Sequence, residues 1–265
     1  MDNRPIGIFD SGLGGLTVLD ALVKELPHES FIYVGDTARV PYGNRSIEKI
    51  NLYSNQICNW LKGKDCKVII VACNTVSSIA LKNLERDFPI PIIGVINAGV
   101  NKALKISKDK SIGVLGTLAT IHSKKYEKQI KAINPKSNVK SIACPLFVPL
   151  VEEGLVIGEI PNKIIELYLE QIKDSSIDTL ILGCTHYPLL KKAIKKYLGD
   201  NIHLVDSGRA IAEEVKNFIM INKLKTIKKE GTFNCFVTDE PKEFNNLAEK
   251  FLGIKLKNTR HIELF

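Results

Sequence analysis

Short, almost continuous apolar runs recur along the chain. They begin near residues 6, 31, 68, 92, 112, 179 and 202, and read IGIF, FIYV, VIIVA, IIGV, IGVLG, TLILG and IHLV. Strands without alternating polar residues are typical of parallel sheets that are buried on both faces. The runs therefore predict the strands of parallel β-sheet.

Helical patterns lie between these runs. TVLDALVKEL, at 17–26, and SIEKINLYSNQICNWLK, at 46–62, both repeat apolar residues at helical spacing. Alternation of strands with such helices predicts a doubly wound α/β architecture. The residues expected to face the core are Val18, Leu19, Leu22, Val23 and Leu26 in the first helix, and Ile47, Ile50, Ile57 and Leu61 in the second.

A faint internal repeat divides the chain. IGIFDSG at residue 6 is similar to IGVLGTL at residue 112, and Cys73 and Cys184 are separated by nearly the same interval. The repeat predicts two similar α/β lobes with parallel sheets, related by a pseudo-twofold axis. We expect 1–96 and 207–265 in the first lobe, where the tail packs back, and 97–206 in the second.

Composition sets limits on partners and location. The net charge of +8 includes a lysine-rich segment at 222–231, but no aromatic residues are interleaved there, so we expect a solvated loop and no nucleic-acid partner. No apolar run has the length of a membrane span, and the N-terminus resembles no signal sequence. We therefore expect a cytoplasmic protein with no membrane partner, whose cysteines are reduced.

Polar residues cluster where predicted strands end. In open parallel sheets ligands bind beyond the carboxyl ends of the strands, and helices that begin there would bind a carboxylate and favour a thiolate. Two lobes facing each other would bring two thiols to opposite sides of one small ligand. The strand ends read Asp10-Ser11, Gly35-Asp36, Cys73-Asn74-Thr75, Cys184-Thr185-His186 and Asp206-Ser207.

Two acid/base groups on opposite faces of a small anion suit inversion of a carbon that bears hydrogen. One group removes the proton, and the other delivers a proton to the opposite face. A thiol with an ordinary pKa of about 8.5 serves as acid or base near neutral pH after modest tuning. The remaining cysteines, Cys58, Cys66, Cys144 and Cys235, are predicted to be structural.

The glycine-rich turn DSGLGG admits other interpretations. Such turns also cradle phosphates, but Thr17 stands where GxGxxG needs its last glycine. Asp10 could be a helix cap instead of a side chain in a cleft. The five histidines show no metal-ligand spacing, so no metal site is expected.

Four motifs together carry a resemblance. FDSGLGGLTVL, DTARVPYGNRS, ACNTVSSIAL and GCTHYPLL occur in the order and spacing of the glutamate racemase family, in the aspartate/glutamate racemase superfamily, over essentially the whole chain. The resemblance implies interconversion of L- and D-glutamate without a cofactor, which supplies D-glutamate for bacterial peptidoglycan. It also implies an active site between the lobes, and we expect a homodimer.

Residue roles follow from the same resemblance. Cys73 would remove the α-proton of D-glutamate with help from Asp10, and Cys184 that of L-glutamate with help from His186 and Glu152, although Glu153 is an adjacent alternative. The positions that match substrate-binding residues are Asp10, Ser11, Tyr42, Gly43, Asn74, Thr75, Thr185 and His186.

Three alternatives stay open at this point. A relative could act on aspartate or another small acid by the same two-thiol chemistry. A nucleotide- or phosphate-binding α/β module would make the cysteines incidental. The basic charge alone would fit a non-enzymatic interaction role.

Overall fold

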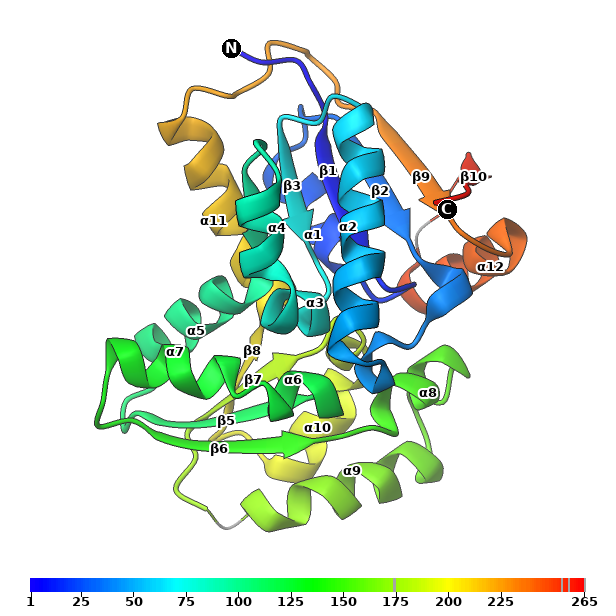
Figure 1. Ribbon diagram of the computed structural model, residues 1–265. Helices are drawn as coiled ribbons and strands as arrows, with labels where there is room; N and C mark the ends of the chain where they lie inside the picture. Colours follow the sequence, from blue (N-terminus) through cyan, green and yellow to red (C-terminus); the bar gives the residue numbers. More distant parts are fainter. Residues whose placement is uncertain (174, 254, 257, 265) are drawn as a thin grey trace.

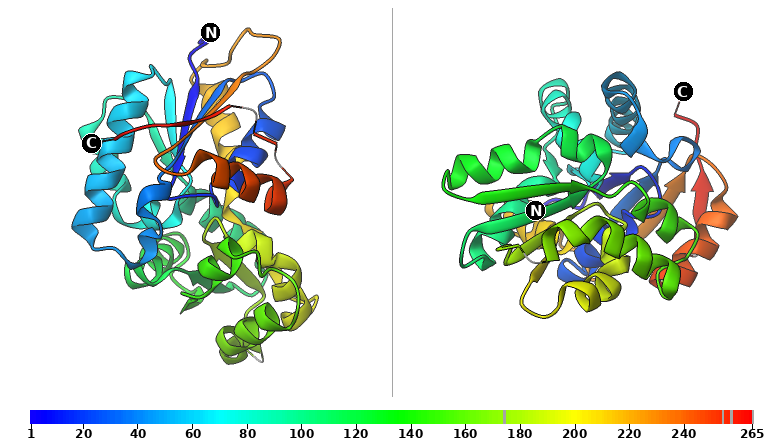
Figure 2. Two further views of the ribbon diagram at one scale, coloured as in Figure 1. Left: turned by 90° about the vertical axis from the view of Figure 1, so that its right-hand side faces the viewer. Right: turned by 90° about the horizontal axis from the view of Figure 1, so that it is seen from below.

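A computed structural model describes residues 1–265 apart from 174, 254, 257 and 265. Two all-parallel sheets form separate lobes, each with helices on both faces (Figure 1). Figure 2 shows the lobes from two further sides, with the C-terminal segment lying on the lobe that holds the N-terminus. The predicted two-lobed, doubly wound α/β fold is confirmed.

The first sheet has six strands in the order β10-β9-β2-β1-β3-β4, and we call its lobe the six-stranded lobe. Its central strands are buried on both faces because apolar side chains point to either side. The strands are β1 (Ile6–Asp10), β2 (Phe31–Gly35), β3 (Val68–Val71), β4 (Ile92–Gly94), β9 (Phe233–Val237) and β10 (Thr259–His261).

The second sheet has four strands in the order β6-β5-β7-β8, and we call its lobe the four-stranded lobe. Strands β5 and β7 form its buried centre, whereas β6 lies at an edge and is half-buried. The strands are β5 (Ser111–Gly116), β6 (Asn138–Ala143), β7 (Thr179–Gly183) and β8 (His203–Asp206).

The helices largely bury the faces that the sequence predicts. Ser46 caps the second predicted helix by accepting a hydrogen bond from the Lys49 amide. Val23 and Ile47 were wrongly assigned to buried faces: they are 39% and 61% exposed. Val23 lies at the border of its apolar stripe, and Ile47 stands in the exposed first turn of its helix. The helices are α1 (Leu16–Glu25), α2 (Ile47–Gly63), α3 (Asn74–Ile79), α4 (Leu81–Asp87), α5 (Val95–Ile106), α6 (Leu118–His122), α7 (Lys125–Ile133), α8 (Phe147–Glu152), α9 (Glu159–Lys173), α10 (Lys191–Leu198), α11 (Ser207–Ile221) and α12 (Pro241–Leu252), with 3-10 turns η1 (Thr37–Arg39), η2 (Tyr42–Asn44) and η3 (Tyr187–Leu190).

The C-terminal tail joins the six-stranded lobe. Strand β9, orange in Figure 1, pairs with the blue strand β2, and β10 pairs with β9. Helix α11 packs against both α1 and α5. The predicted division at 96/97 falls in the first turn of α5, and the domain boundaries stay a prediction.

One buried ion pair joins four segments of the six-stranded lobe. Lys67 Nζ donates to Glu29 Oε2 at 2.6 Å and to the carbonyl oxygens of Asp2 and Leu224 at 2.9 and 2.7 Å. Glu29 Oε1 accepts from the Thr226 amide at 2.9 Å. The side chains of Lys67 and Glu29 are 0% and 3% exposed, so water replaces neither partner.

We expect Lys67→Met to lower the free energy of unfolding by about 3–5 kcal/mol, because the Glu29 carboxylate is left buried without its cation. Urea denaturation measures the change. Lys24→Met is the matched control: its partner Asp20 lies on the surface of α1, and the exposed pair is worth less than about 1 kcal/mol. Equal effects of the two substitutions would show that the buried pair contributes nothing special.

Candidate active site

Most of the predicted site residues line a small cavity between the lobes, but Asp10 and Glu152 are not part of its lining. Its volume is about 20 Å³, room for about one water molecule, so the structure shows a closed site. A ligand as large as an amino acid therefore requires the walls to separate. The lining residues are Ser11, Val40, Pro41, Tyr42, Gly43, Cys73, Asn74, Thr75, Thr117, Val148, Cys184, Thr185 and His186.

The two cysteines come from equivalent places in the two lobes. Cys73 follows β3 and precedes the first residue of α3, and Cys184 directly follows β7. Both strands have a neighbour on each side in their sheets, and their carboxyl ends place the two thiols in the lining of one cavity. After Cys184 the chain first makes the 3-10 turn η3, and a regular helix begins only at Lys191, later than the sequence suggests.

Cys73 is a buried thiol in the closed site. It is 5% exposed, and its Sγ lies 3.9 Å from Ser11 Oγ. Burial raises the pKa of Cys73 to about 12, and the neighbouring Asp10 and Cys184 raise it further than the Val76 amide lowers it. The helix start does favour the thiolate through the Val76 amide, but desolvation outweighs this effect in the closed site, so the net shift of the Cys73 pKa is upward.

Cys184, His186 and Glu152 lie next to one another in a row. The Sγ of Cys184 lies 3.8 Å from His186 Nδ1, and His186 Nε2 lies 3.2 Å from Glu152 Oε1. Burial alone would lower the pKa of His186, but its contacts with Cys184 and Glu152 raise it to about 10. An imidazolium beside the sulfur stabilises negative charge there. Glu152 is the carboxylate that reaches this histidine, whereas Glu153 is exposed.

Asp10 makes two kinds of contact next to the cavity, although it does not line the cavity itself. Its Oδ2 accepts from the Gly12 and Gly15 amides at 3.1 and 3.0 Å, which organises the glycine-rich turn before α1. Its Oδ1 accepts from Thr185 Oγ1 at 3.4 Å, across the lobes. Burial raises the pKa of Asp10, although His186 and the two amides oppose this. Asp10 does not cap α1, whose N-cap is Gly15 without a side-chain cap hydrogen bond, and it is not among the residues that line the cavity, so its place in the cleft stays a prediction.

Gly14 allows the turn to lie directly against the second cysteine segment. A Cβ atom at this position would stand 2.4 Å from Thr185 Oγ1 and 2.5 Å from His186 Nδ1. Such distances are far below any real contact, so only glycine fits without displacing those side chains. The turn is thus an inter-lobe contact, and glycine here serves packing.

A second set of buried polar residues holds Tyr42, which lines the cavity. Asp36 accepts hydrogen bonds from the hydroxyl of Tyr42, from Arg39 Nε and from Thr238 Oγ1, the last at 2.9 Å. Asp36 is fully buried. The sequence marks it as a polar strand end but assigns it no role, because its partner Thr238 lies in the C-terminal tail.

The cavity also has lining residues that the sequence does not indicate. Thr117 Oγ1 lies 3.0 Å from Thr75 Oγ1, and Val148 contributes apolar wall. Tyr126, behind the wall, donates a hydrogen bond to Asn74. Among the described residues, no group of three or more histidine, cysteine or acidic side chains is placed to hold a metal ion.

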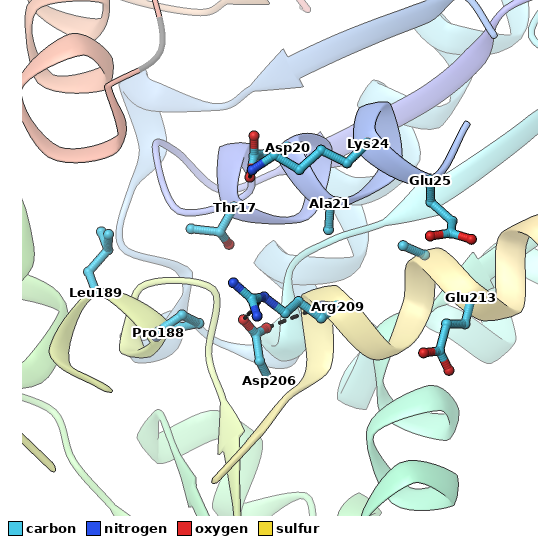
Figure 3. A pocket seen from close by; sticks show the side chains of 11 residues that line it. Thr17, Asp20, Ala21, Lys24, Glu25, Pro188, Leu189, Asp206, Arg209 and Glu213 are labelled. Carbon is cyan, nitrogen blue, oxygen red and sulfur yellow. Dashed lines mark hydrogen bonds and ion pairs between the residues drawn. The ribbon is translucent and has the colours of Figure 1, made fainter. Parts of the chain in front are cut away.

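A larger groove of about 370 Å³ lies between α1, η3 and α11 (Figure 3). Its labelled side chains are mainly charged, as at Lys24, Glu25, Arg209 and Glu213, and neither cysteine nor histidine lines it. The cysteines and the histidine that the sequence singles out therefore line the small cavity and not this groove. No helix in the described part of the chain is long and apolar enough to cross a membrane.

Two parallel-sheet lobes that enclose a small cavity lined by two thiols have the arrangement of an α/β enzyme for a small substrate. Residues 6–215 match the model of the Asp/Glu/Hydantoin racemase family. Glutamate racemase from Aquifex aeolicus is 47% identical over 262 residues, covering 98% of this chain and 98% of that protein.

Solved structures of glutamate racemases are also similar to this chain. Glutamate racemase isoform RacE1 from Bacillus anthracis is 36% identical, with a TM-score of 0.97 over 100% of this chain and 99% of that one. Glutamate racemase from Francisella tularensis, crystallised with D-glutamate, is 40% identical, with a TM-score of 0.94 over 100% of this chain and 99% of that one. The chain therefore belongs to the Asp/Glu/hydantoin racemase family, and within that family to the glutamate racemases.

Proposed function

We propose that the chain interconverts L- and D-glutamate without a cofactor, with Cys73 and Cys184 as the two acid/base groups. The observation that supports this most is that the two thiols line one cavity, each from a different lobe. This placement fits transfer of hydrogen between the two faces of one carbon.

In the proposed reaction the Cys73 thiolate takes the α-proton of D-glutamate, and the electron pair remains on Cα next to the carboxylate. The Cys184 thiol then delivers its proton to the opposite face, which gives L-glutamate and leaves Cys184 as the thiolate. The reverse direction exchanges the two roles. Each step moves one proton and needs no oxidant or reductant.

Neighbouring groups have complementary tasks in this proposal. Asp10 assists Cys73, while His186, in contact with Glu152, stabilises the Cys184 thiolate. Substrate carboxylates and the amino group bind to polar side chains and backbone of the walls. We assign this binding to Asp10, Ser11, Tyr42, Gly43, Asn74, Thr75, Thr185 and His186.

Substrate entry requires motion, because the closed cavity of about 20 Å³ does not admit glutamate. We infer that residues 1–96 with 207–265 move relative to 97–206. We also propose a cytoplasmic homodimer that supplies D-glutamate for peptidoglycan. Exposed apolar side chains between the N-terminus of α8 and the first turn of α9 are candidates for its interface: Leu146, Leu155, Ile157 and Ile160.

Circular dichroism of D-glutamate solutions tests the activity. After exhaustive dialysis and treatment with a carbonyl-trapping reagent, we expect the signal to decay to zero, because the proposed chemistry uses only side chains. With D-aspartate we expect kcat/KM to be about 10- to 200-fold lower, the discrimination that one methylene supports. Activity that returns only with pyridoxal phosphate contradicts the mechanism, and equal turnover of both acids contradicts the substrate.

A further inference from the structure

The side-chain amide oxygen and nitrogen of Asn74 differ in their hydrogen bonding. The residue is 2% exposed and lines the cavity beside Cys73. Its Oδ1 accepts a hydrogen bond from the Tyr126 hydroxyl at 2.6 Å, and Ser207 Oγ lies 3.5 Å from the same oxygen. Its Nδ2 is buried and has no hydrogen-bond partner among the described residues.

A buried amide nitrogen without a partner is costly, by about 1–3 kcal/mol. The cost is removed when a ligand supplies an acceptor. Nδ2 carries two N–H donors and accepts nothing, so in a zwitterionic amino acid it matches a carboxylate oxygen and not the ammonium group.

Tyr126 is fixed as the donor in this pair. It stands in α7 of the four-stranded lobe, is 2% exposed, and burial raises the pKa of its hydroxyl, so the proton stays on the oxygen. Its ring lies against Gly183, directly before Cys184, where a Cβ atom would stand 3.1 Å from Tyr126 Cε2. The ring thus has little freedom to move away from Asn74.

We propose that Tyr126 is a positioning residue for the substrate: by holding Oδ1 of Asn74, it directs Nδ2 into the cavity to bind a carboxylate oxygen of glutamate. This inference rests on the proposed function. The hydrogen bond joins the two lobes, since Asn74 belongs to α3 of the six-stranded lobe and Tyr126 to α7. Closure of the lobes and orientation of the substrate-binding amide are therefore one event.

The test is Tyr126→Phe, which keeps the ring and removes only the donor. We expect KM for both enantiomers to rise about tenfold and kcat to change less than threefold, because the lost contact acts equally on bound substrate and transition state. Asn74→Ala is expected to raise KM by a similar factor. In the double variant, Tyr126→Phe adds less than twofold to the effect of Asn74→Ala, because Tyr126 acts through Asn74.

Tyr187→Phe is the matched control for a lost buried hydroxyl. Its hydroxyl donates to the Cys144 carbonyl oxygen at 3.0 Å, it is 0% exposed, and it makes no hydrogen bond to Asn74. We expect Tyr187→Phe to lower the melting temperature by as much as Tyr126→Phe does, but to change KM by less than twofold. A tenfold rise in KM for Tyr187→Phe as well would assign the effect to general destabilisation and overturn the proposal.

Two further outcomes separate this inference from the proposed function. Multiplicative effects of Tyr126→Phe and Asn74→Ala on KM overturn the positioning role while racemisation stands. If no racemisation is detected, calorimetric titration with glutamate replaces the measurement of KM. Binding of glutamate without racemisation refutes the proposed function. In that case a tenfold weaker Kd for Tyr126→Phe still supports the positioning role. A chain that neither binds nor racemises glutamate refutes both.

Discussion

Cys73→Ala and Cys184→Ala are each expected to lower racemisation of glutamate at least 10³-fold, as measured by circular dichroism from either enantiomer. Each direction needs one thiolate to take a proton and one thiol to give one, and a positioned acid or base contributes about 10²- to 10⁴-fold. Alanine removes the sulfur and leaves the backbone at the strand end intact. Because L- and D-glutamate have equal free energies in water, kcat/KM must fall by the same factor in both directions.

Cys58→Ala is the matched control, since Cys58 is a free thiol in α2, fully buried and outside the cavity lining. We expect its activity to stay within about twofold of the unmodified chain. Far-ultraviolet circular dichroism and the melting temperature establish that all three variants are folded. Near-normal racemisation by either Cys73→Ala or Cys184→Ala would reject a mechanism with two essential thiols.

The fold could be predicted where burial is symmetrical. All seven apolar runs form strands, because a parallel strand covered on both faces needs apolar residues throughout. Strand β6 escaped this criterion since NVKSIA alternates and lies at an edge of its sheet. Strand β10 is only three residues long and mostly exposed, so neither periodicity nor hydropathy marks it.

The site could be predicted where its residues are neighbours in sequence. Cys184 and His186 follow one strand, and their 3.8 Å contact is local. Asp36 and Tyr126 could not be assigned, because their partners Thr238 and Asn74 lie far away along the chain and meet them only after the sheets assemble. The choice between Glu152 and Glu153 likewise depends on the direction in which α8 presents its last turn.

Closure of the cavity raises the pKa of the Cys73 thiol. A polar site open to water would leave the pKa of Cys73 near its ordinary value, but burial raises it to about 12. Below this pKa, the thiolate fraction of Cys73 in the closed site rises about tenfold per pH unit. We infer that the proposed opening of the lobes returns water to the thiols and lets both exchange protons with solvent before a substrate molecule binds.

Exchange of the thiol protons with solvent gives the most direct distinction between a mechanism with two bases and a mechanism with one. In deuterated water, we expect D-glutamate to yield L-glutamate that carries one solvent deuterium at Cα, because Cys184 delivers the hydron it took from solvent while Cys73 keeps the substrate proton. Proton nuclear magnetic resonance and mass spectrometry of the separated enantiomers measure the label. D-glutamate recovered at low conversion is expected to remain mostly unlabelled.

The reverse experiment is its internal control. Starting from L-glutamate, Cys73 delivers the hydron, and early D-glutamate is expected to carry the deuterium while L-glutamate stays mostly unlabelled. A single base that moves a captured proton from one face to the other would return a measurable share of protium to the product. Protium-rich early product in either direction would therefore assign proton removal and delivery to the same group, and one of the two opposing thiols would have no part in the transfer.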